Sequence, residues 1–537
     1  MPQLPAELKW AQALGRDFTH GSTVQSFIDG RTALAAIHRA IQTTHGSGDF
    51  IYLLAWWLDP DLPLVWSGDE PDPSSTLHEI LPEKAKAGVQ IRAMLWPNPS
   101  KLFAPHDSPG ELAAIVRQGI DPEEYYARIL NDLPADPTQN RSAEIADLPR
   151  SHKRIVEWIN SLPGAAAIDD GLTPRRSGCH HQKVLCVRGS EGLYALCGGV
   201  DLNPDRVAVV RHGRGEPLHD VHCEVRGPAA VDLVQVFLQR WDSHPSGAHY
   251  DQTVGPVLGR TIAHGPDVPG APGQIVRVAT TFNRVSPEDL KKLDRRACKV
   301  ERGIRDGLLG AIASARGFIY FEDQYMTSLT VAEALGRAAK NLKYVLALIT
   351  GSAISDLPQV WRRRKEFIAC ARSKGLGDKL HVYYLVDPVR PPDAQENTYI
   401  HAKTWVFDDE LAYVGSANVN NRGLSSDSEV GLFICDRTTS VCPPHGFAKD
   451  LRIRLWARHL GMEVLDGCTG IDAWQSPPPS QTSASYRVRP YDPDGGKDHP
   501  ILDAIPWSIV DPDLEDLPEC ESGVDRARRL LHKAVES

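Results

Sequence analysis

The sequence predicts an α/β fold made of two similar α/β/α sandwich halves, related by a pseudo-two-fold axis, with a candidate site at their interface. Three observations support this prediction. Helical and strand-like segments alternate along most of the 537-residue chain. A His-x-Lys triplet that opens an apolar strand occurs twice, at residues 181–183 and 401–403. A turn of small residues follows each of these strands, at 198–201 and 415–418.

The first half contains helices and strands in alternating order. Apolar residues with a helical period predict helices over residues 32–42 and 76–87. Short apolar runs predict buried strands over 50–56 and 89–95, and the strand 184–187 follows the first triplet. These elements should form one sheet with helices packed on it.

The second half repeats this order. The expected elements are a helix over 300–315, a strand over 318–321, a helix from about 331, a strand over 344–350, a helix over 359–374, a strand over 380–385 and a strand over 404–407. A pseudo-two-fold relation between the halves would bring both triplets to the shared interface.

The duplication also suggests the domain boundaries. We expect a first half over residues 1–260, a second half over 274–470 and a Pro- and Asp-rich extension over 471–537. A polar, Pro-rich insertion over about 97–178 precedes the first triplet. Loops around the mouth of a site and a surface elaboration without function are both open interpretations of this insertion.

Composition and charge restrict the functional class. The apolar fraction of 42% allows a large core, and no apolar run approaches the roughly 20 residues of a membrane span. Residues 1–25 lack the order of a secretory signal, so we expect synthesis in the cytoplasm, with export by a signal-less route as an open alternative. The net charge of −10 disfavours nucleic acid as a partner. The ten scattered cysteines are expected to stay reduced. We also expect the protein to be a monomer.

The two triplets predict a chemistry. Side chains two positions apart on a strand leave the same face, so each triplet presents an imidazole beside an ammonium group. Displacement at a phosphodiester needs a nucleophile, an acid for the leaving alkoxide and positive charge for the phosphoryl oxygens. Two histidines and two lysines supply all of these without a metal. A single triplet arises easily by chance, whereas a duplicate with matching strand and turn does not.

These residues resemble the phospholipase D superfamily, whose signature is a repeated His-x-Lys-x4-Asp. The resemblance runs from about residue 25 to 462 and is closer to the phosphatidylcholine-type phospholipases D than to the nuclease branch. Besides the triplets, it rests on the stretches Gly198-Gly199-Val200-Asp201-Leu202, His219-Asp220-Val221-His222, Phe321-Glu322-Asp323-Gln324-Tyr325, Gly415-Ser416-Ala417-Asn418 and Asp427-Ser428-Glu429.

The resemblance implies roles for the site residues. His181 would attack phosphorus and form a phosphohistidine, and His401 would protonate the leaving alcohol and then activate water or another alcohol. The side chains expected to hold the phosphoryl oxygens are Lys183, Lys403, Asn418 and Ser416.

The resemblance also implies that each half orients the histidine of the other. A carboxylate is needed at one ring nitrogen to fix the tautomer in which the other nitrogen can react. We therefore assign Glu429 to His181 and Asp220 to His401.

The first motif departs from the family pattern. Asp408 completes the second motif, but Arg188 occupies the equivalent position in the first. We expect supporting roles for Asp408 and Asp201. Because Arg188 has odd spacing from Lys183, it should face away from the phosphate, and we expect it to meet a carboxylate or backbone oxygens. A phosphate-binding pseudoenzyme therefore stays open as an alternative.

The activity implied by the resemblance is a phospholipase D. It would hydrolyse glycerophospholipids at a membrane surface, as a peripheral protein, to phosphatidic acid and a free headgroup, with transfer to other alcohols as a side reaction. Another phosphodiesterase of the superfamily, such as a nuclease, is the enzymatic alternative. No cofactor or metal is expected for the chemistry, and calcium would serve membrane binding only.

Overall fold

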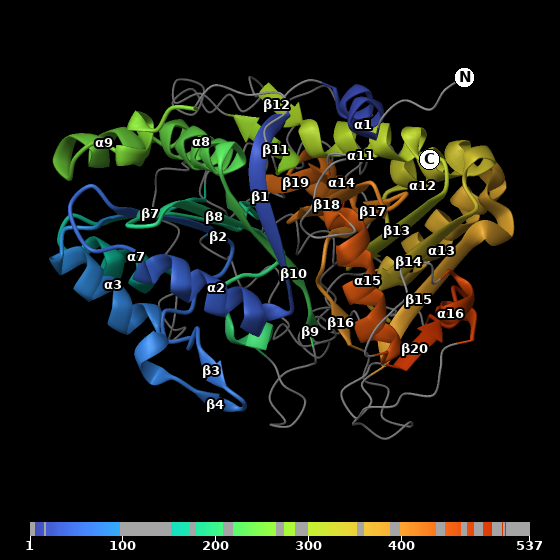
Figure 1. The fold of residues 1–537 in the computed structure, drawn as a ribbon, viewed down its shortest axis with the longest axis horizontal. Coiled ribbons are helices and arrows are strands. Elements are labelled where there is room, and N and C mark those ends of the chain that lie inside the picture. Colours follow the sequence, from blue (N-terminus) through green and yellow to red (C-terminus); the bar gives the residue numbers. More distant parts are fainter. Residues whose placement is uncertain are drawn as a thin grey trace, which may run out of the picture.

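The computed structural model describes residues 6–15, 18–96, 152–171, 179–207, 218–264, 273–284, 299–351, 359–386, 398–436, 446–462, 470–476, 487–496, 507 and 511. Most of the insertion and most of the C-terminal extension lie outside these residues. Within them the chain forms a mixed α/β fold around a 16-stranded sheet (Figure 1). This confirms the predicted fold class.

The first half contains both helices and strands, and the described residues begin with a helix. Its helices and strands are α1 (Ala6–Leu14), β1 (Thr19–Ile28), α2 (Gly30–Gln42), β2 (Phe50–Ala55), β3 (Trp66–Ser67), β4 (Glu70–Pro71), α3 (Leu77–Lys86), β5 (Gln90–Leu95), α7 (His152–Asn160), β6 (Ala166–Asp169), β7 (Val184–Gly189), β8 (Gly192–Gly198), β9 (Leu218–His219), β10 (Val221–Arg226), α8 (Pro228–Ser243) and α9 (Pro245–Thr253). Helix α1 opens the first half in the chain but packs on α11 of the second half.

The second half follows the same plan. Its elements are β11 (Gln274–Arg284), β12 (Lys299–Arg302), α11 (Gly303–Ser314), β13 (Phe318–Asp323), α12 (Leu329–Ala338), β14 (Tyr344–Ile349), α13 (Val360–Ala371), β15 (Leu380–Val386), β16 (Tyr399–Ile400), β17 (Thr404–Phe407), β18 (Leu411–Gly415), α14 (Asn421–Ser425), β19 (Glu429–Cys435), α15 (Phe447–Leu460), α16 (Asp472–Gln475) and β20 (Arg487–Pro490).

The strand order shows the duplication directly. The first half runs β6-β5-β2-β7-β8-β10-β1, and the second runs β15-β14-β13-β17-β18-β19-β11 with β20 added at its outer edge. In each half the two outermost pairs of these seven strands are parallel and the others are antiparallel. The central strands β1 and β11 pair with each other and join the halves, which lie on either side of them in Figure 1.

Continuous apolar runs explain why strands β2 and β13 lie in the interior of the fold. All six residues of β2, Phe-Ile-Tyr-Leu-Leu-Ala, are buried, and β13 begins with the same Phe-Ile-Tyr. Such runs fit strands that are covered by helices on both faces. On one face α8 and α15 pack against both halves. On the other face α2, α3 and α7 cover the first half, and α1, α11, α12 and α13 cover the second.

Two local expectations differ from the structure. The helix expected over 300–315 starts at Gly303, because residues 299–302 pair with β11 as β12. The described part of the insertion supplies helix α7 and the edge strand β6, which pairs in parallel with β5. This part of the insertion therefore extends the sheet of the first half and is not a loop.

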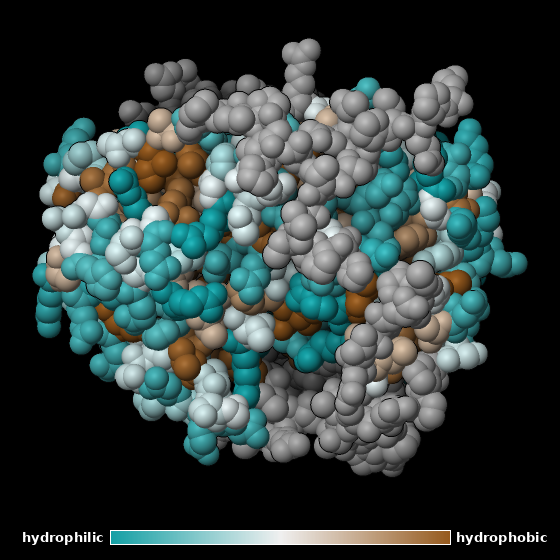
Figure 2. All heavy atoms as spheres, in the orientation of Figure 1, coloured by the Kyte–Doolittle hydropathy of each residue, from teal (hydrophilic) through white to brown (hydrophobic). Residues whose placement is uncertain are grey.

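The described surface is mainly polar. Figure 2 shows hydrophilic side chains over most of the described atoms on one face, with apolar side chains in smaller groups between them. Among the described residues, no helix has the length and apolar character that crossing a bilayer requires.

Candidate active site

Both His-x-Lys triplets lie immediately before a central strand. His181 and Lys183 precede β7, and His401 and Lys403 precede β17. Each lysine Nζ donates a hydrogen bond back to the carbonyl oxygen of its own histidine, at 3.0 Å for Lys183. The two triplets therefore have the same local geometry in the two halves.

The two halves position each other's histidine. The backbone N–H of His181 donates to the Ser428 carbonyl at 2.9 Å, and its Nδ1 lies 2.9 and 3.0 Å from the two carboxylate oxygens of Glu429. The backbone N–H of His401 donates to the His219 carbonyl at 2.8 Å. Its Nδ1 lies 2.8 Å from Asp220 Oδ2. The structure thus pairs the carboxylates with the histidines as the sequence analysis assigned them, and the catalytic roles stay predictions.

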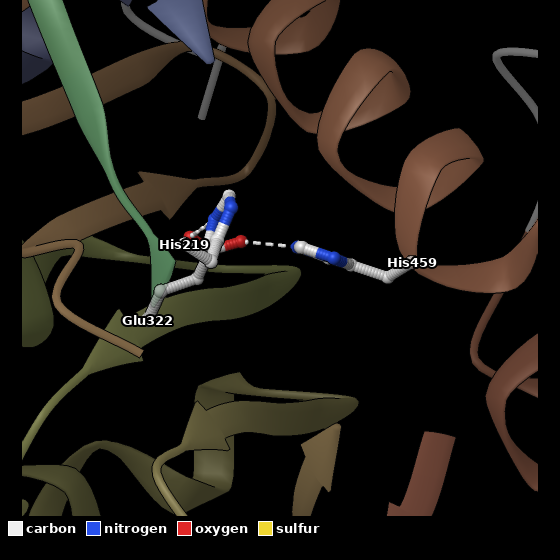
Figure 3. A group of neighbouring side chains, drawn as sticks. All are labelled: His219, Glu322 and His459. Atoms are coloured by element: carbon white, nitrogen blue, oxygen red, sulfur yellow. Dashed lines mark hydrogen bonds and ion pairs between the residues drawn. The ribbon is translucent and has the colours of Figure 1, made fainter. Parts of the chain in front are cut away.

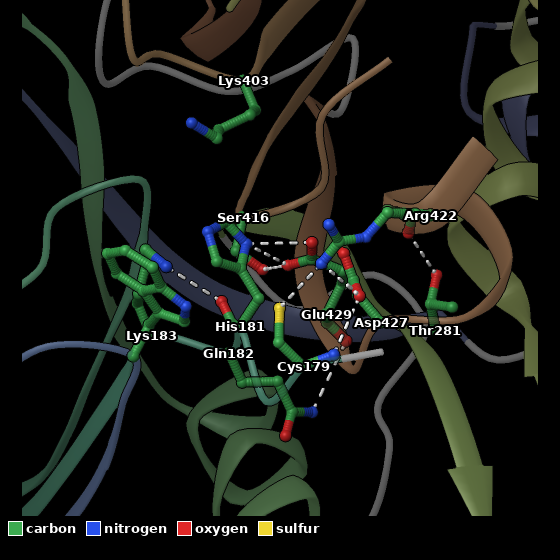
Figure 4. A network of polar contacts seen from close by, with 12 residues as sticks. Cys179, His181, Gln182, Lys183, Thr281, Lys403, Ser416, Arg422, Asp427 and Glu429 are labelled. Carbon is green, nitrogen blue, oxygen red and sulfur yellow. Dashed lines mark hydrogen bonds and ion pairs between the residues drawn. The ribbon is translucent and has the colours of Figure 1, made fainter. Parts of the chain in front are cut away.

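Ser416 lies behind the first histidine. Figure 4 shows dashed lines from both the His181 ring and Ser416 to the Glu429 carboxylate. The Ser416 hydroxyl donates to Glu429 and accepts the backbone N–H of Val430 at 3.0 Å. Its hydrogen therefore points at Glu429, and a direct contact with phosphate would require the hydroxyl to rotate.

Asn418 and Asp201 occupy equivalent places after the two small-residue turns. Asn418 is 7% exposed, and its Oδ1 has no hydrogen-bond partner among the described residues. A buried polar atom of this kind is usually satisfied by a ligand or water. Asp201 forms an ion pair with Lys183 at 3.1 Å and accepts the backbone N–H groups of Trp56 and Trp57. Asp201 thereby ties the loop after β2 to the site.

Electrostatic interactions indicate that the two histidines and two lysines of the triplets share one site. Burial, and then the charges of Lys183 and Lys403, hold the pKa of His181 well below its usual value. The pKa of His401 is also held well below its usual value, first by burial and then by the charges of Arg206 and Lys403. Burial lowers the pKa of Lys403 to about 7. Both imidazoles are therefore neutral near pH 7 in a cationic environment.

Arg206 is a site residue that sequence reasoning missed. Its guanidinium Nη2 lies 3.2 Å from His401 Nε2 and 3.6 Å from Asp201 Oδ2. Because a guanidinium only donates hydrogen bonds, His401 Nε2 must accept, and the ring proton lies on Nδ1 toward Asp220. Arg206 follows the turn that begins at Gly198, but no spacing rule marked it.

A second missed arginine supports the first histidine. Arg422 Nη2 lies 3.3 Å from Asp427 Oδ1, which also accepts the backbone N–H of Cys179 at 2.9 Å (Figure 4). The carboxylate of Asp511 accepts the backbone N–H groups of Asn421 and Arg422. One residue of the C-terminal extension therefore contacts the segment that carries this network.

The structure explains why the first motif tolerates Arg188. Asp408 accepts the backbone N–H groups of Arg316, Gly317 and Phe318 at 2.7 to 2.9 Å and so fixes the turn before β13. In the first half Asp49 binds backbone N–H groups of its own turn before β2.

The expected partner of Arg188 is absent among the described residues. The Arg188 side chain is exposed at the end of β7, where no hydrogen bond or ion pair joins it to another described side chain or backbone atom. The expectation of a buried supporting contact was wrong, because the strand reaches solvent at this position.

One group of described side chains has the spacing of metal ligands. It consists of His219, Glu322 and His459, whose ligand atoms lie within 4.8 Å of one another. The group lies behind Asp220. No metal was expected from the sequence, although His219 and Glu322 stand in stretches that carry the family resemblance.

Comparison with family models gives two matches. Residues 202–342 match the model described as phospholipase D. Residues 308–442 match the model described as cardiolipin synthase, phospholipase D-like domain. The second match contains the His401 triplet, Asn418 and Glu429.

Curated relatives are plant enzymes. Phospholipase D alpha 3 of Arabidopsis thaliana is 24% identical over 527 aligned residues, covering 76% of this chain and 61% of the relative. Phospholipase D alpha 1 of Cynara cardunculus is 23% identical, covering 77% of this chain and 62% of the relative. The chain thus spans about three fifths of the length of these relatives.

A solved structure has a similar fold. The phosphatidylserine synthase of Haemophilus influenzae Rd KW20 superposes with a TM-score of 0.50 at 12% identity. The superposition covers 81% of this chain and 87% of that chain. At this identity the likeness concerns the fold.

Proposed function

The chain belongs to the phospholipase D superfamily, and from this premise we propose that it is a phospholipase D that hydrolyses glycerophospholipids to phosphatidic acid and a free headgroup. Transfer of the phosphatidyl group to another alcohol would be a side reaction. The observation that carries the proposal is the crosswise pairing of His181 with Glu429 and of His401 with Asp220, beside two lysines.

The first step uses both histidines. His181 is neutral and donates a hydrogen bond from its Nδ1–H to Glu429, so the lone pair of Nε2 is available for attack on phosphorus. The new P–N bond forms as the P–O bond to the headgroup breaks. His401, protonated at Nε2 once the anionic diester is bound, gives that proton to the leaving alkoxide.

The second step reverses the proton transfer. His401 takes a proton from water, whose oxygen attacks the phosphohistidine and breaks the P–N bond. An alcohol in place of water gives transfer instead of hydrolysis. Lys183, Lys403 and the amide of Asn418 stabilise the phosphoryl oxygens during both steps. Arg206 must release His401 Nε2 when substrate enters, and its charge then remains beside the phosphate.

An apolar residue near the site supports a lipid substrate. Trp57 is 38% exposed, and its ring lies 6.0 Å from that of Trp56. The Trp56 ring meets the His181 imidazole edge-on at 5.8 Å. An exposed indole this close to the nucleophile suits contact with a membrane interface. The net charge of −10 disfavours the nuclease alternative.

Two substrates separate the proposed function from its alternatives. Purified protein is incubated with vesicles of mixed phospholipids and, separately, with plasmid DNA. Phosphatidic acid and headgroup are expected from vesicles, and a phosphatidyl alcohol when ethanol is present. Cleavage of DNA alone would favour the nuclease alternative. Turnover of neither substrate, with retained phosphate binding, would favour the pseudoenzyme.

Trapping the intermediate tests the two histidine roles. His181→Ala should abolish turnover. His401→Asn should accumulate a labelled phosphoenzyme on residue 181 when the leaving group is good, because that group departs without a proton. Label on His401 in a His181 variant would reverse the roles, and an active enzyme without label at either position would contradict covalent catalysis.

A further inference from the structure

Four buried or half-buried titratable side chains form one group behind Asp220. His219 Nδ1 lies 3.0 Å from Asp29 Oδ1, and its Nε2 lies 2.8 Å from Glu322 Oε2. The other Glu322 oxygen lies 2.8 Å from His459 Nε2. Figure 3 shows Glu322 bonded to both imidazoles. We call Asp29, His219, Glu322 and His459 the buried histidine cluster.

The contacts of His219 determine its charge. A carboxylate only accepts hydrogen bonds, so a ring with a carboxylate at each nitrogen must donate from both and carry a positive charge. Burial alone would disfavour this cation, but Glu322 and Asp29 raise the pKa of His219 to about 10. Asp29 also forms an ion pair with Arg458. Two carboxylates thus face two cations, and the buried charges compensate one another.

This charge balance argues for a proton, and against a metal ion, in the cluster. His219, Glu322 and His459 have fully buried side chains, so solvent is not at hand to complete the coordination of an ion that these three groups would bind. With Arg458 counted, a divalent ion in place of the His219 proton would change the net charge of the group from zero to plus one. The Tyr320 hydroxyl also donates to Glu322. The hydrogen-bonded form already satisfies both Glu322 oxygens.

The cluster is attached to the acid/base histidine through the backbone. The His219 carbonyl accepts the N–H groups of His401 and Ala402, at 2.8 and 3.2 Å. The next residue, Asp220, holds His401 Nδ1, and its own carbonyl accepts the N–H of Asp29 at 2.8 Å. Asp29 has a φ of 69°, which is rare outside glycine and costs energy unless its contacts fix it.

The cluster stands behind only one of the two histidines. Strands β2 and β13 begin with the same three residues, but Leu54 occupies the position in β2 that Glu322 occupies in β13. At the other site the Ser428 carbonyl binds His181 without a histidine at that position. The asymmetry matches the proposed chemistry, because only the acid/base histidine must gain and lose a proton in each turnover.

We propose that the buried histidine cluster is a positioning device for the acid/base histidine, in which Asp29, His219, Glu322 and His459 hold Asp220 and thereby the ring of His401. The inference rests on the proposed function, in which His401 transfers the proton. None of the four residues touches the substrate, so they are positioning residues.

The test is Glu322→Gln, which keeps the shape of the side chain and removes its charge. Two diesters are compared, one with choline and one with p-nitrophenol as the leaving group. We expect kcat for the choline substrate to fall at least about tenfold with little change in KM. The pre-steady-state burst of p-nitrophenol should change less than about threefold, because this group leaves without a proton. Its steady-state rate should fall, since hydrolysis still needs His401.

Two further variants guard against a misfolded protein. Asp29→Asn keeps a side chain that tolerates positive φ and should give the same split between burst and steady state. His78→Asn breaks a His–carboxylate pair with Asp61 that is about half exposed, and should leave all rates unchanged. Thermal melting confirms that each variant is folded.

Several results would overturn the inference. One is a Glu322→Gln protein that is folded but in which the p-nitrophenol burst and the steady-state rate fall by the same factor. Another is a stoichiometric metal ion in the purified wild-type protein. If the wild type turns over neither diester, the proposed function fails, and NMR still tests the cluster. The Nδ1–H resonance of His401 should then exchange faster with water in Glu322→Gln, and an unchanged resonance would refute the positioning role.

Discussion

Replacement of Asp408 should destabilise the fold, whereas replacement of Arg188 should not, although the two residues occupy equivalent motif positions. One oxygen of Asp408 accepts the half-buried N–H groups of Gly317 and Phe318. Hydrogen bonds to a charged group contribute about 1.5–3 kcal/mol each, so Asp408→Ala should lower the free energy of unfolding by about 3–6 kcal/mol. The contacts of Arg316 and Lys9 with the other oxygen are left out of this sum, because solvent screens them.

Two further variants sharpen this comparison. Asp408→Asn keeps the accepting oxygen without its charge, so the loss should be smaller, about 1–3 kcal/mol. Arg188→Asp changes an exposed side chain and should shift stability by less than about 0.5 kcal/mol, with no gain in turnover.

Urea unfolding followed by tryptophan fluorescence measures each change, and turnover per folded molecule is measured beside it. A loss below about 1 kcal/mol for Asp408→Ala would refute the reasoning about the turn. A several-fold gain in turnover for Arg188→Asp would show that Arg188 is a catalytic defect and would favour the pseudoenzyme.

The other predictions concern the site itself. A Cβ at position 199 would lie 2.0 Å from Asp220 Oδ1, so Gly199→Ala should displace Asp220 and lower kcat at least about tenfold, and an unchanged kcat would contradict the assigned role. Arg206→Met removes a cation that, after burial, lowers the pKa of His401, so His401 should keep the proton for the leaving group up to a higher pH and the alkaline limb of the kcat/KM profile that it sets should move to higher pH; an unmoved limb would show that His401 does not set it. Because Lys403 has a pKa of about 7 and loses its charge above that value, kcat/KM should decline as pH rises through about 7. Chelators should leave turnover of a soluble short-chain substrate intact, and a loss that one specific metal restores would contradict metal-free chemistry.

Local pattern and repetition along the chain were enough to predict the main elements and the paired triplets. Helical and strand-like periods located the main elements, since burial of one face imposes them on the chain. The repeat of His-x-Lys identified the two histidines and two lysines, and the family resemblance supplied the crosswise partners Glu429 and Asp220.

Contacts between residues far apart in the chain could not be predicted from these patterns. Arg206 contacts His401 across 195 positions, and Asp511 binds the backbone of Arg422 from the C-terminal extension. Periodicity carries no information about such pairs, because each contact depends on how the halves pack. The same reason explains the error at Arg188: spacing along β7 gave the direction of its side chain, but only the end of the strand showed that this direction leads into solvent.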